Sequence, residues 1–290
     1  MEKFNLKDLK RLYKPKSNSS KEDNGQVVII GGSSLFHGAP ILALKTASRL
    51  SDMVFFASPE PSLSEVAAKI KGFLSSFIWV PWEEVEEYIK KADACLIGPG
   101  FMRYHQESQR SKVKSKKVYD EVYEKTKEIT ENLFEEFPKK RWVVDAGSLQ
   151  VIRPEVLPKG AIITPNKKEY QMLFGKKKPE EQARKYKIII VYKKGPQTII
   201  CSPKQTVLIK GGNAGLTKGG TGDVLAGVAV ALLAKNDPFL SACAASYVVK
   251  KAAEVLYSKV GFVFSADDLA SEVPKVLGKY YREGRKRKKS

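Results

Sequence analysis

The chain has 290 residues, of which 42% are hydrophobic and 29% charged. These ordinary globular proportions exclude a collagen-like, coiled-coil or wholly disordered chain. With 51 Lys and Arg against 32 Asp and Glu, the formal net charge is +19 at pH 7, which permits anionic partners such as nucleotides, nucleic acid or a membrane surface.

Short apolar runs rich in β-branched residues predict a series of strands along the first two thirds of the chain. These runs are residues 27–30, 53–57, 77–80, 94–97, 142–145, 161–164 and 188–192. Because the runs are continuously apolar rather than alternating, they indicate a parallel sheet that is covered by helices on both faces. We therefore expect an α/β fold with a doubly wound, mainly parallel sheet, and ligands at the carboxyl ends of its strands.

Helical spacing between and after these runs predicts the covering helices. Early helices are expected at residues 40–50, 63–72, 83–91 and 168–174, and the longest late ones at 223–234 and 239–259. The charged stretch 103–141 is expected to form a loop and one long surface helix, whose apolar stripe consists of Val118, Val122, Ile129, Leu133 and Phe137. Residues 198–201 and 206–209 flank a short turn and predict a hairpin.

No repeat or low-complexity linker divides the chain, so we expect one domain over residues 1–278 that carries the charged insertion at 103–141. A basic tail follows at 279–290, where residues 279–289 hold seven bases and one acid. Such a tail is interpreted as a frayed, solvated terminus, with RNA contact as the alternative.

Cysteine usage and hydropathy point to the cytoplasm. The three cysteines, Cys95, Cys201 and Cys243, are too sparse for a disulfide framework. The longest apolar run, residues 224–234, is far shorter than a membrane span, and the charged N-terminus lacks the apolar core of a signal peptide. We expect a protein without a membrane segment.

The most informative motif is a glycine cluster at residues 218–227, KGGTGDVLAG, which opens into an apolar helix. Glycines let backbone N–H groups approach an anion, and a helix N-terminus adds free donors and a positive dipole end. Asp223 would repel phosphate there unless it accepted a proton from an attacking hydroxyl. The alternative is that Asp223 is an ordinary first-turn acid of the helix.

This cluster resembles the anion-hole and catalytic-base segment of the ribokinase-like superfamily, and further segments resemble the nicotinamide-nucleotide-hydrate dehydratases. In that family's order, the chain presents residues 21–33 with 38–40, then 98–100, 145–147, 164–169, 194–198, 219–227 and 265–269. Each segment is short and weak alone. Their shared order over most of the chain makes the resemblance specific.

The resemblance implies an enzyme that repairs hydrated NADH or NADPH, in which a nucleotide phosphorylates the ring hydroxyl and phosphate then leaves. Asp223 would be the base, and the N–H groups of Gly220, Thr221 and Gly222 would stabilise the transferred phosphoryl group. By the same resemblance the hydrate is bound by Ala39, Gly100, Asn166 and Asp223. The nucleotide is bound by Lys194, Gly195, Pro196, Gln197, Thr198 and Gly222.

Alternatives remain for several of these positions. Ala39 and Gly100 are also the small residues that crowded strand ends require, and Lys194 is also compatible with a surface lysine. Asn166 and Glu169 form the superfamily's NxxE pattern, whose acid supports Mg²⁺ and phosphate through water. A surface helix is the competing interpretation of Glu169.

The donor nucleotide stays open between ADP and ATP. Asn166 replaces a His of many bacterial members and resembles eukaryotic members that prefer ATP, whereas family members outside eukaryotes usually use ADP, which we favour. Gly147 replaces the family's second Asp in residues 145–147. No stretch resembles the epimerase domain often fused in microbes, so the resemblance implies a separate epimerase partner, together with a homo-oligomer, favoured as a tetramer.

Two alternative functions stay open. A kinase of the same superfamily would phosphorylate a vitamin precursor or sugar hydroxyl with the same loop and the same Asp223. A basic RNA-binding protein on an inactive kinase scaffold would rest on the charge and the tail alone. We expect neither nucleic acid nor a membrane as partner.

Overall fold

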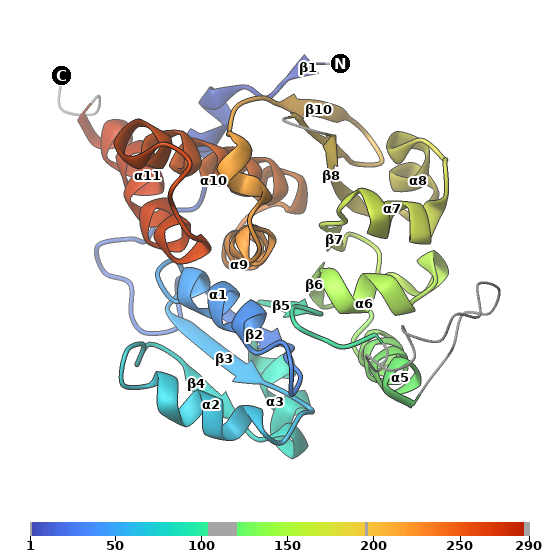
Figure 1. Ribbon diagram of the computed structural model, residues 1–290. Helices are drawn as coiled ribbons and strands as arrows, with labels where there is room; N and C mark the ends of the chain where they lie inside the picture. Colours follow the sequence, from blue (N-terminus) through green and yellow to red (C-terminus); the bar gives the residue numbers. More distant parts are fainter. Residues whose placement is uncertain (1, 104–120, 195–196, 287–290) are drawn as a thin grey trace.

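A ten-stranded sheet runs through the computed structural model, in which residues 2–103, 121–194 and 197–286 are described (Figure 1). Its order is β1-β10-β9-β8-β7-β6-β5-β2-β3-β4. The strands are β1 (Glu2–Lys3), β2 (Gln26–Ile30), β3 (Met53–Ala57), β4 (Ile78–Val80), β5 (Ala94–Ile97), β6 (Arg141–Val144), β7 (Ile162–Ile163), β8 (Ile189–Lys194), β9 (Gln197–Cys201) and β10 (Thr206–Ile209). All neighbouring strands pair in parallel except β8–β9 and β9–β10.

The predicted doubly wound, mainly parallel sheet is confirmed. Alternate residues of β2 show why its sequence is continuously apolar: Val27 and Ile29 join one core cluster, whereas Val28 and Ile30 join the other. All four side chains are fully buried. A strand with helices on both faces has no solvent side on which to place polar residues.

Two helical layers cover the sheet (Figure 1). The first holds α1 (Gly38–Ala47), α2 (Leu63–Ile70), α9 (Thr221–Leu233), α10 (Pro238–Val260) and α11 (Ala266–Lys286). On the other face lie α3 (Val85–Lys91), α5 (Glu121–Glu136), α6 (Ala146–Val151), α7 (Lys167–Phe174) and α8 (Pro179–Tyr186). Short 3₁₀ turns are η1 (Leu6–Arg11), η2 (Trp82–Glu84), η3 (Pro154–Val156) and η4 (Ala214–Thr217). None of the described helices is both long and apolar enough to cross a membrane.

Several elements differ from the sequence-based expectation. The surface helix expected within 103–141 is found as α5, while the expected loop and Val118 lie among residues 104–120, outside the described part. Helix α11 was not predicted, because Pro274 interrupts its pattern. It continues through Lys286, past the expected start of the tail at 279, and the hydroxyls of Tyr247 and Tyr280 lie 2.7 Å apart. The short α6 and the polar α8 were also missed.

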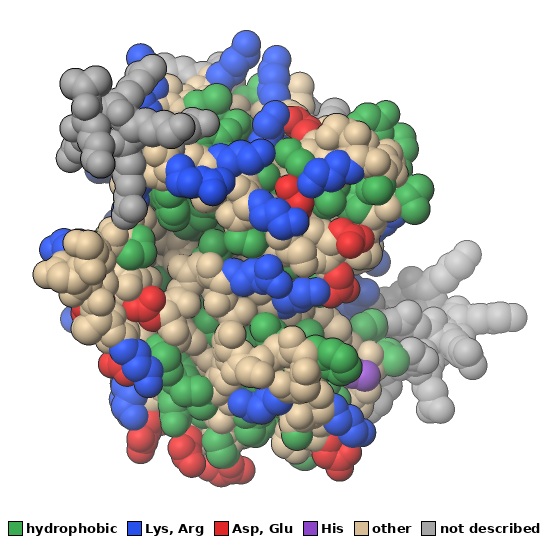
Figure 2. Space-filling view, turned by 90° about the vertical axis from the view of Figure 1, so that its left-hand side faces the viewer, with side chains coloured by type: hydrophobic (Ala, Val, Ile, Leu, Met, Phe, Trp, Pro, Cys, Tyr) green, Lys and Arg blue, Asp and Glu red, His purple; other side chains and the backbone are tan. Residues whose placement is uncertain are grey.

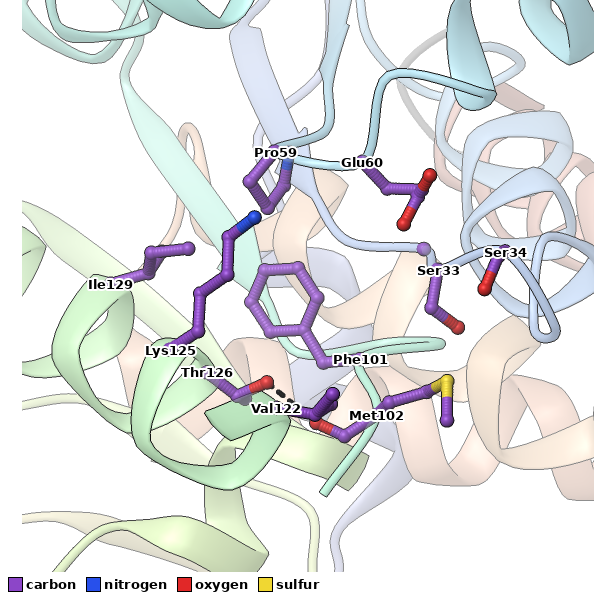
Figure 3. A pocket seen from close by; sticks show the side chains of 11 residues that line it. Ser33, Ser34, Pro59, Glu60, Phe101, Met102, Val122, Lys125, Thr126 and Ile129 are labelled. Carbon is purple, nitrogen blue, oxygen red and sulfur yellow. Dashed lines mark hydrogen bonds between the residues drawn. The ribbon is translucent and has the colours of Figure 1, made fainter. Parts of the chain in front are cut away.

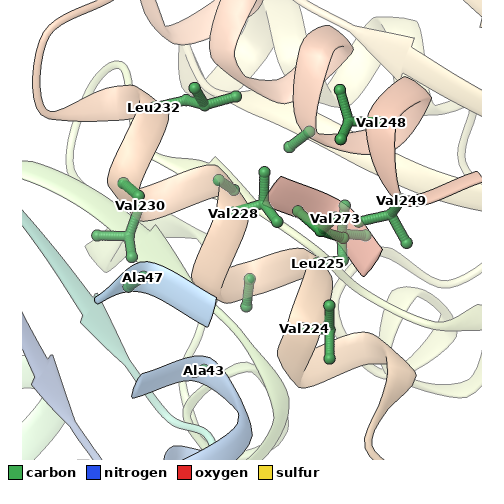
Figure 4. Close-up of a cluster of buried hydrophobic side chains, with 14 of the residues drawn as sticks. Ala43, Ala47, Val224, Leu225, Val228, Val230, Leu232, Val248, Val249 and Val273 are labelled. Atoms are coloured by element: carbon green, nitrogen blue, oxygen red, sulfur yellow. The ribbon is translucent and has the colours of Figure 1, made fainter. Parts of the chain in front are cut away.

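Helix α9 is the most deeply buried element of the first layer (Figure 4). Every residue from Val224 to Leu233 is buried, and α1 and α10 pack against it. Gly227 makes the approach of α1 possible, since a Cβ atom at this position would lie 2.6 Å from the backbone oxygen of Ala43. The packing of α9 between two helices and the sheet therefore depends on a missing side chain.

We predict that Gly227→Ala lowers the free energy of unfolding by about 1–3 kcal/mol, because the added methyl group meets backbone that cannot rotate away. Gly278→Ala is the matched control, since Gly278 lies in α11 with open space around its Cβ position. The control should be neutral or stabilising by up to about 1 kcal/mol. Urea unfolding of both variants checks this, and equal stabilities would contradict the close packing.

Candidate active site

A cavity of about 760 Å³ opens at the carboxyl ends of β6, β7 and β8, beside the first turn of α9. Its wall brings together residues that are far apart in the sequence. From the strand ends come Asp145, Thr164, Lys193 and Thr198; from the start of α7 come Asn166 and Glu169; and from the glycine cluster come Gly220, Thr221, Gly222 and Asp223. The α10 wall adds Ser246, Val249 and Lys250.

The glycine loop is held in place by its own polar groups. The hydroxyl of Thr221 donates to the backbone oxygens of Leu216 at 2.8 Å and Lys218 at 2.9 Å. In turn, Nζ of Lys218 donates to the carbonyls of Phe262 at 2.6 Å and Phe264 at 2.7 Å. These bonds fix the loop to the segment between α10 and α11. Helix α9 begins at Thr221, two residues earlier than predicted, so Gly222 and Asp223 lie in its first turn.

The start of α7 is a capping box. The side chain of Asn166 accepts from the backbone N–H groups of Lys168 at 2.8 Å and Glu169 at 3.0 Å. Oε2 of Glu169 accepts from Asn166 N at 2.9 Å, and Oε1 accepts from Nε2 of Gln150 at 2.8 Å. Arg103 in turn donates to Gln150. The surface-helix interpretation of Glu169 is therefore wrong: its side chain is buried and both its oxygens are engaged.

Two carboxyl groups in the cavity differ in proton affinity. Burial, with the charges of Asp223 and Glu169, raises the pKa of Asp145 to about 8. Oδ1 of Asp145 also accepts from the Thr164 hydroxyl at 2.8 Å. Burial raises the pKa of Asp223 to about 6, a rise that the nearby Lys193 opposes. Burial thus favours the protonated form of both carboxyl groups, and the rise is larger for Asp145 than for Asp223.

A smaller cavity of about 220 Å³ lies at the carboxyl ends of β2, β3 and β5 (Figure 3). The strand order reverses between β2 and β5, which is where open α/β sheets form a ligand crevice. Ser33 follows β2, Glu60 follows β3, and Phe101 follows β5, and all three line this cavity. Lys125 and Thr126 of α5 close the other side.

Some predicted site residues lie away from the larger cavity. Ala39, in α1, and Gly100, after β5, are not among its lining residues. A Cβ atom at Gly100 would lie 2.2 Å from the backbone oxygen of Phe36 and 2.9 Å from Cδ of Pro40, so Gly100 is packed against the start of α1. Gln197 is exposed at the start of β9. Lys194 ends β8, but its side chain lies outside the described part of the chain, as do Gly195 and Pro196.

Gly147 has a steric explanation. A Cβ atom there would lie 2.4 Å from the backbone oxygen of Phe101 and 2.6 Å from its Cβ. The family's second Asp has no room at this position while Phe101 keeps its place in the smaller cavity. The glycine at position 147 is therefore explained by the close packing of Phe101 against it.

The cavity residues that were not assigned a role from the sequence include Asp145, Lys193 and Lys250. Asp145 directly follows the buried strand β6, the position where ligand-binding side chains collect. Lys193 lies on the same face of β8 as Ile189 and Val191, the face that meets the first helical layer. Lys250 continues the buried helical spacing of Cys243 and Ser246. Both lysines occupy positions that the apolar periodicity of their strand or helix assigns to the interior. This signal could have identified them as cavity residues.

Solved structures confirm the fold class. A ribokinase-like superfamily protein from Enterococcus faecalis superposes with a TM-score of 0.78 and 21% identity, over 96% of each chain. An ADP/ATP-dependent NAD(P)H-hydrate dehydratase from Bacillus subtilis, co-crystallised with ATP/Mg²⁺, gives a TM-score of 0.74 and 23% identity over 96% of this chain and 98% of that one. The protein therefore has the ribokinase-like fold.

The chain belongs to the NAD(P)H-hydrate dehydratase family, whose model matches residues 27–275. It is 33% identical to a bifunctional NAD(P)H-hydrate repair enzyme of Methanocaldococcus jannaschii over 93% of this chain and 51% of that enzyme. It thus spans about half the length of the first curated relatives that it matches. An ADP-dependent (S)-NAD(P)H-hydrate dehydratase of Nitrosopumilus maritimus is 30% identical over 90% of this chain and 91% of its own length.

The raised pKa of Asp145 predicts a pH-dependent stability. A carboxyl group that binds its proton more tightly in the folded state contributes most to stability at low pH, and loses this contribution as pH rises from about 3.8 through about 8. Asp145→Asn cannot ionise and keeps an oxygen for the Thr164 hydroxyl. We expect it to be more stable than the wild type by about 1 kcal/mol or more near pH 8.5.

The variant's advantage should shrink towards about pH 5, because the wild-type carboxyl group is then protonated in the folded protein. Denaturant unfolding at both pH values measures the difference. An advantage that is independent of pH, or a loss of stability at both values, would contradict the raised pKa of Asp145.

Proposed function

We propose that the protein catalyses nucleotide-dependent dehydration of hydrated NADH and NADPH. The observation that carries this proposal is the cavity in which Asp223 lies in the first turn of α9, beside the glycine loop. Membership of the NAD(P)H-hydrate dehydratase family supports the choice of substrate. The larger cavity also falls within the size range of small-molecule sites, about 300–1,000 Å³.

Hydroxide is a poor leaving group, so the ring hydroxyl must first be converted into a better one. Asp223 accepts the hydroxyl proton while the oxygen attacks the terminal phosphoryl group of the nucleotide, and the nucleotide with one phosphate fewer leaves as that bond to phosphorus breaks. Backbone N–H groups of Gly220, Thr221 and Gly222 stabilise the negative charge on the group in transfer. The carbon–oxygen bond then breaks, phosphate leaves with the ring oxygen, and loss of a ring proton restores the double bond.

The acidic cavity wall fits a Mg²⁺ ion bound jointly with nucleotide phosphates. Both oxygens of Glu169 already accept hydrogen bonds, so this carboxylate would act on the ion through water. Among the described residues, no three His, Cys, Asp or Glu side chains form a metal cluster; Mg²⁺ held by water and phosphates does not need one. When bound, the ion would neutralise phosphate charge.

The hydrate would lie between the two cavities. Asn166 and Asp223 would bind it from the larger cavity. Gly100 packs against Gly32, which lines the smaller cavity, and against Pro40, which follows Ala39 in the first turn of α1. The nucleotide would occupy the larger cavity, whose wall includes Thr198 and Gly222. The predicted contacts with residues 194–197 remain proposals. ADP is our proposed donor, and the name of the Nitrosopumilus maritimus relative supports this choice. A separate epimerase and a tetrameric assembly also remain proposals.

A superfamily kinase is the second candidate, because phosphoryl transfer to a hydroxyl needs the same loop and base. The family match favours the dehydratase. An RNA-binding role is favoured by charge alone: on the face shown in Figure 2, Lys and Arg side chains lie interspersed with hydrophobic and polar ones.

We predict that the purified protein with Mg²⁺ and ADP or ATP restores the absorbance of reduced nicotinamide from NADH hydrate. The expected product is intact NADH together with inorganic phosphate. A stable phosphorylated hydrate would instead favour a kinase. Absence of recovery with both nucleotides, from protein shown to be folded, would remove the proposal.

Asp223→Asn should lower kcat by about a hundredfold or more, because the general base is lost, while nucleotide binding is retained. Asp267→Asn is the matched control: Asp267 is a first-turn acid of α11 and is two-thirds exposed. Steady-state kinetics and calorimetric nucleotide binding on both variants give the comparison. If both variants turned over like the wild type, Asp223 would be only a helix acid.

A further inference from the structure

Lys250 is a buried cation on the α10 wall of the larger cavity. Lys250 is only 7% exposed, and its Nζ atom donates to the backbone oxygen of Gly211 at 3.0 Å. Lysine is almost never buried this deeply unless its charge is used. Its neighbour Lys251 is half-buried, does not line the cavity, and pairs with Glu254 at 2.9 Å.

A second lysine lines the same cavity from the opposite element. Lys193 comes from β8, and its charge is attracted by Asp145, Asp223 and Glu169. Burial and the charge of Lys193 lower the pKa of Lys250 to about 8. Lys193 is therefore close enough to act on both the three carboxyl groups and Lys250. Lys193 is half-buried and Lys250 is buried, so an anion that lies between these two like charges would be favoured.

Residues 211–213 are held against α10, so the ammonium group of Lys250, which donates to this loop, has a defined position. Besides the bond from Lys250 to Gly211, Oε1 of Glu254 accepts from Gly212 N at 3.0 Å. The side chain of Asn213 donates to the carbonyl of Ala253 at 2.8 Å. Three bonds thus dock residues 211–213 onto α10. A cation held in this way can bind an anion without a large loss of side-chain entropy.

We propose that Lys250 binds the phosphate of the donor nucleotide that is nearest to the ribose and is not transferred. The inference rests on the proposed function, which places the transferred phosphoryl group at Asp223 and the glycine loop. A phosphate chain that runs from this loop past Lys193 reaches the α10 wall at Lys250. The retained phosphate then lies between the two lysines and accepts charge-assisted hydrogen bonds from Lys250.

Calorimetric binding of AMP, ADP and adenosine to Lys250→Met tests the proposal. Affinity for AMP and ADP should fall by about tenfold or more, as expected for the loss of a charge-assisted hydrogen bond, whereas affinity for adenosine stays within about twofold. Lys251→Met is the control and should leave all three affinities within about twofold, as for other exposed pairs. Unchanged AMP binding, or an equal loss for adenosine, would overturn the role of Lys250.

A second measurement on the wild-type protein covers the case in which Lys250→Met does not fold. Cyanate carbamylates neutral amines, and mass spectrometry can follow Lys250 and Lys251 separately. ADP should lower labelling of Lys250 by about fivefold or more relative to adenosine, with no such difference at Lys251. Equal labelling of Lys250 in both complexes, including none in either, would contradict the proposal.

These binding measurements do not depend on turnover. A protein that binds ADP through Lys250 but does not dehydrate the hydrate would leave this inference standing and remove the proposed function. A protein that dehydrates the hydrate, but whose affinities for AMP and ADP do not change in Lys250→Met, would support the proposed function and overturn this inference.

Discussion

The burial of α9 is the constraint on which the site depends. Every residue from Val224 to Leu233 is inside the protein, between α1, α10 and the sheet, so the helix has no freedom to shift along its axis. Its first turn therefore delivers Asp223 and the glycine loop to a fixed place at the strand ends. Bonds from Thr221 and Lys218 hold the loop from the other side. Catalytic groups need such support, because small displacements from a productive geometry are costly.

The same burial that fixes these groups also sets their charges. Desolvation raises the pKa of Asp145 more than that of Asp223, so the two carboxyl groups favour the protonated form to different degrees. Lys193 lies beside the acids, and Lys250 lies farther along the wall of the cavity. Negative charge at the strand ends and positive charge towards α10 suit a nucleotide whose terminal phosphoryl group meets the base while the rest of its phosphate chain meets lysine.

Much of this could be predicted from the sequence, because parallel strands and phosphate loops are local patterns. Continuous apolar runs identify the strands, and the glycine cluster places Asp223 at the start of a helix, where the structure has it. The role of Asp223 as a base stays a prediction. The lysines could not be assigned in this way, since the roles of Lys193 and Lys250 depend on which face of a strand or helix meets the cavity. Gly147 is similar: its reason is the backbone of Phe101, which is close only in the folded chain. Helix α11 was missed because Pro274 hides its periodicity.

The central claim is that dehydration proceeds through phosphorylation of the ring hydroxyl at Asp223. The fate of the ring oxygen tests it most directly. With hydrate labelled by ¹⁸O at the hydroxyl, ADP and Mg²⁺, the label should appear in inorganic phosphate, with one phosphate released for each NADH formed. Label found in water, while unlabelled phosphate is released independently of NADH, would contradict the account.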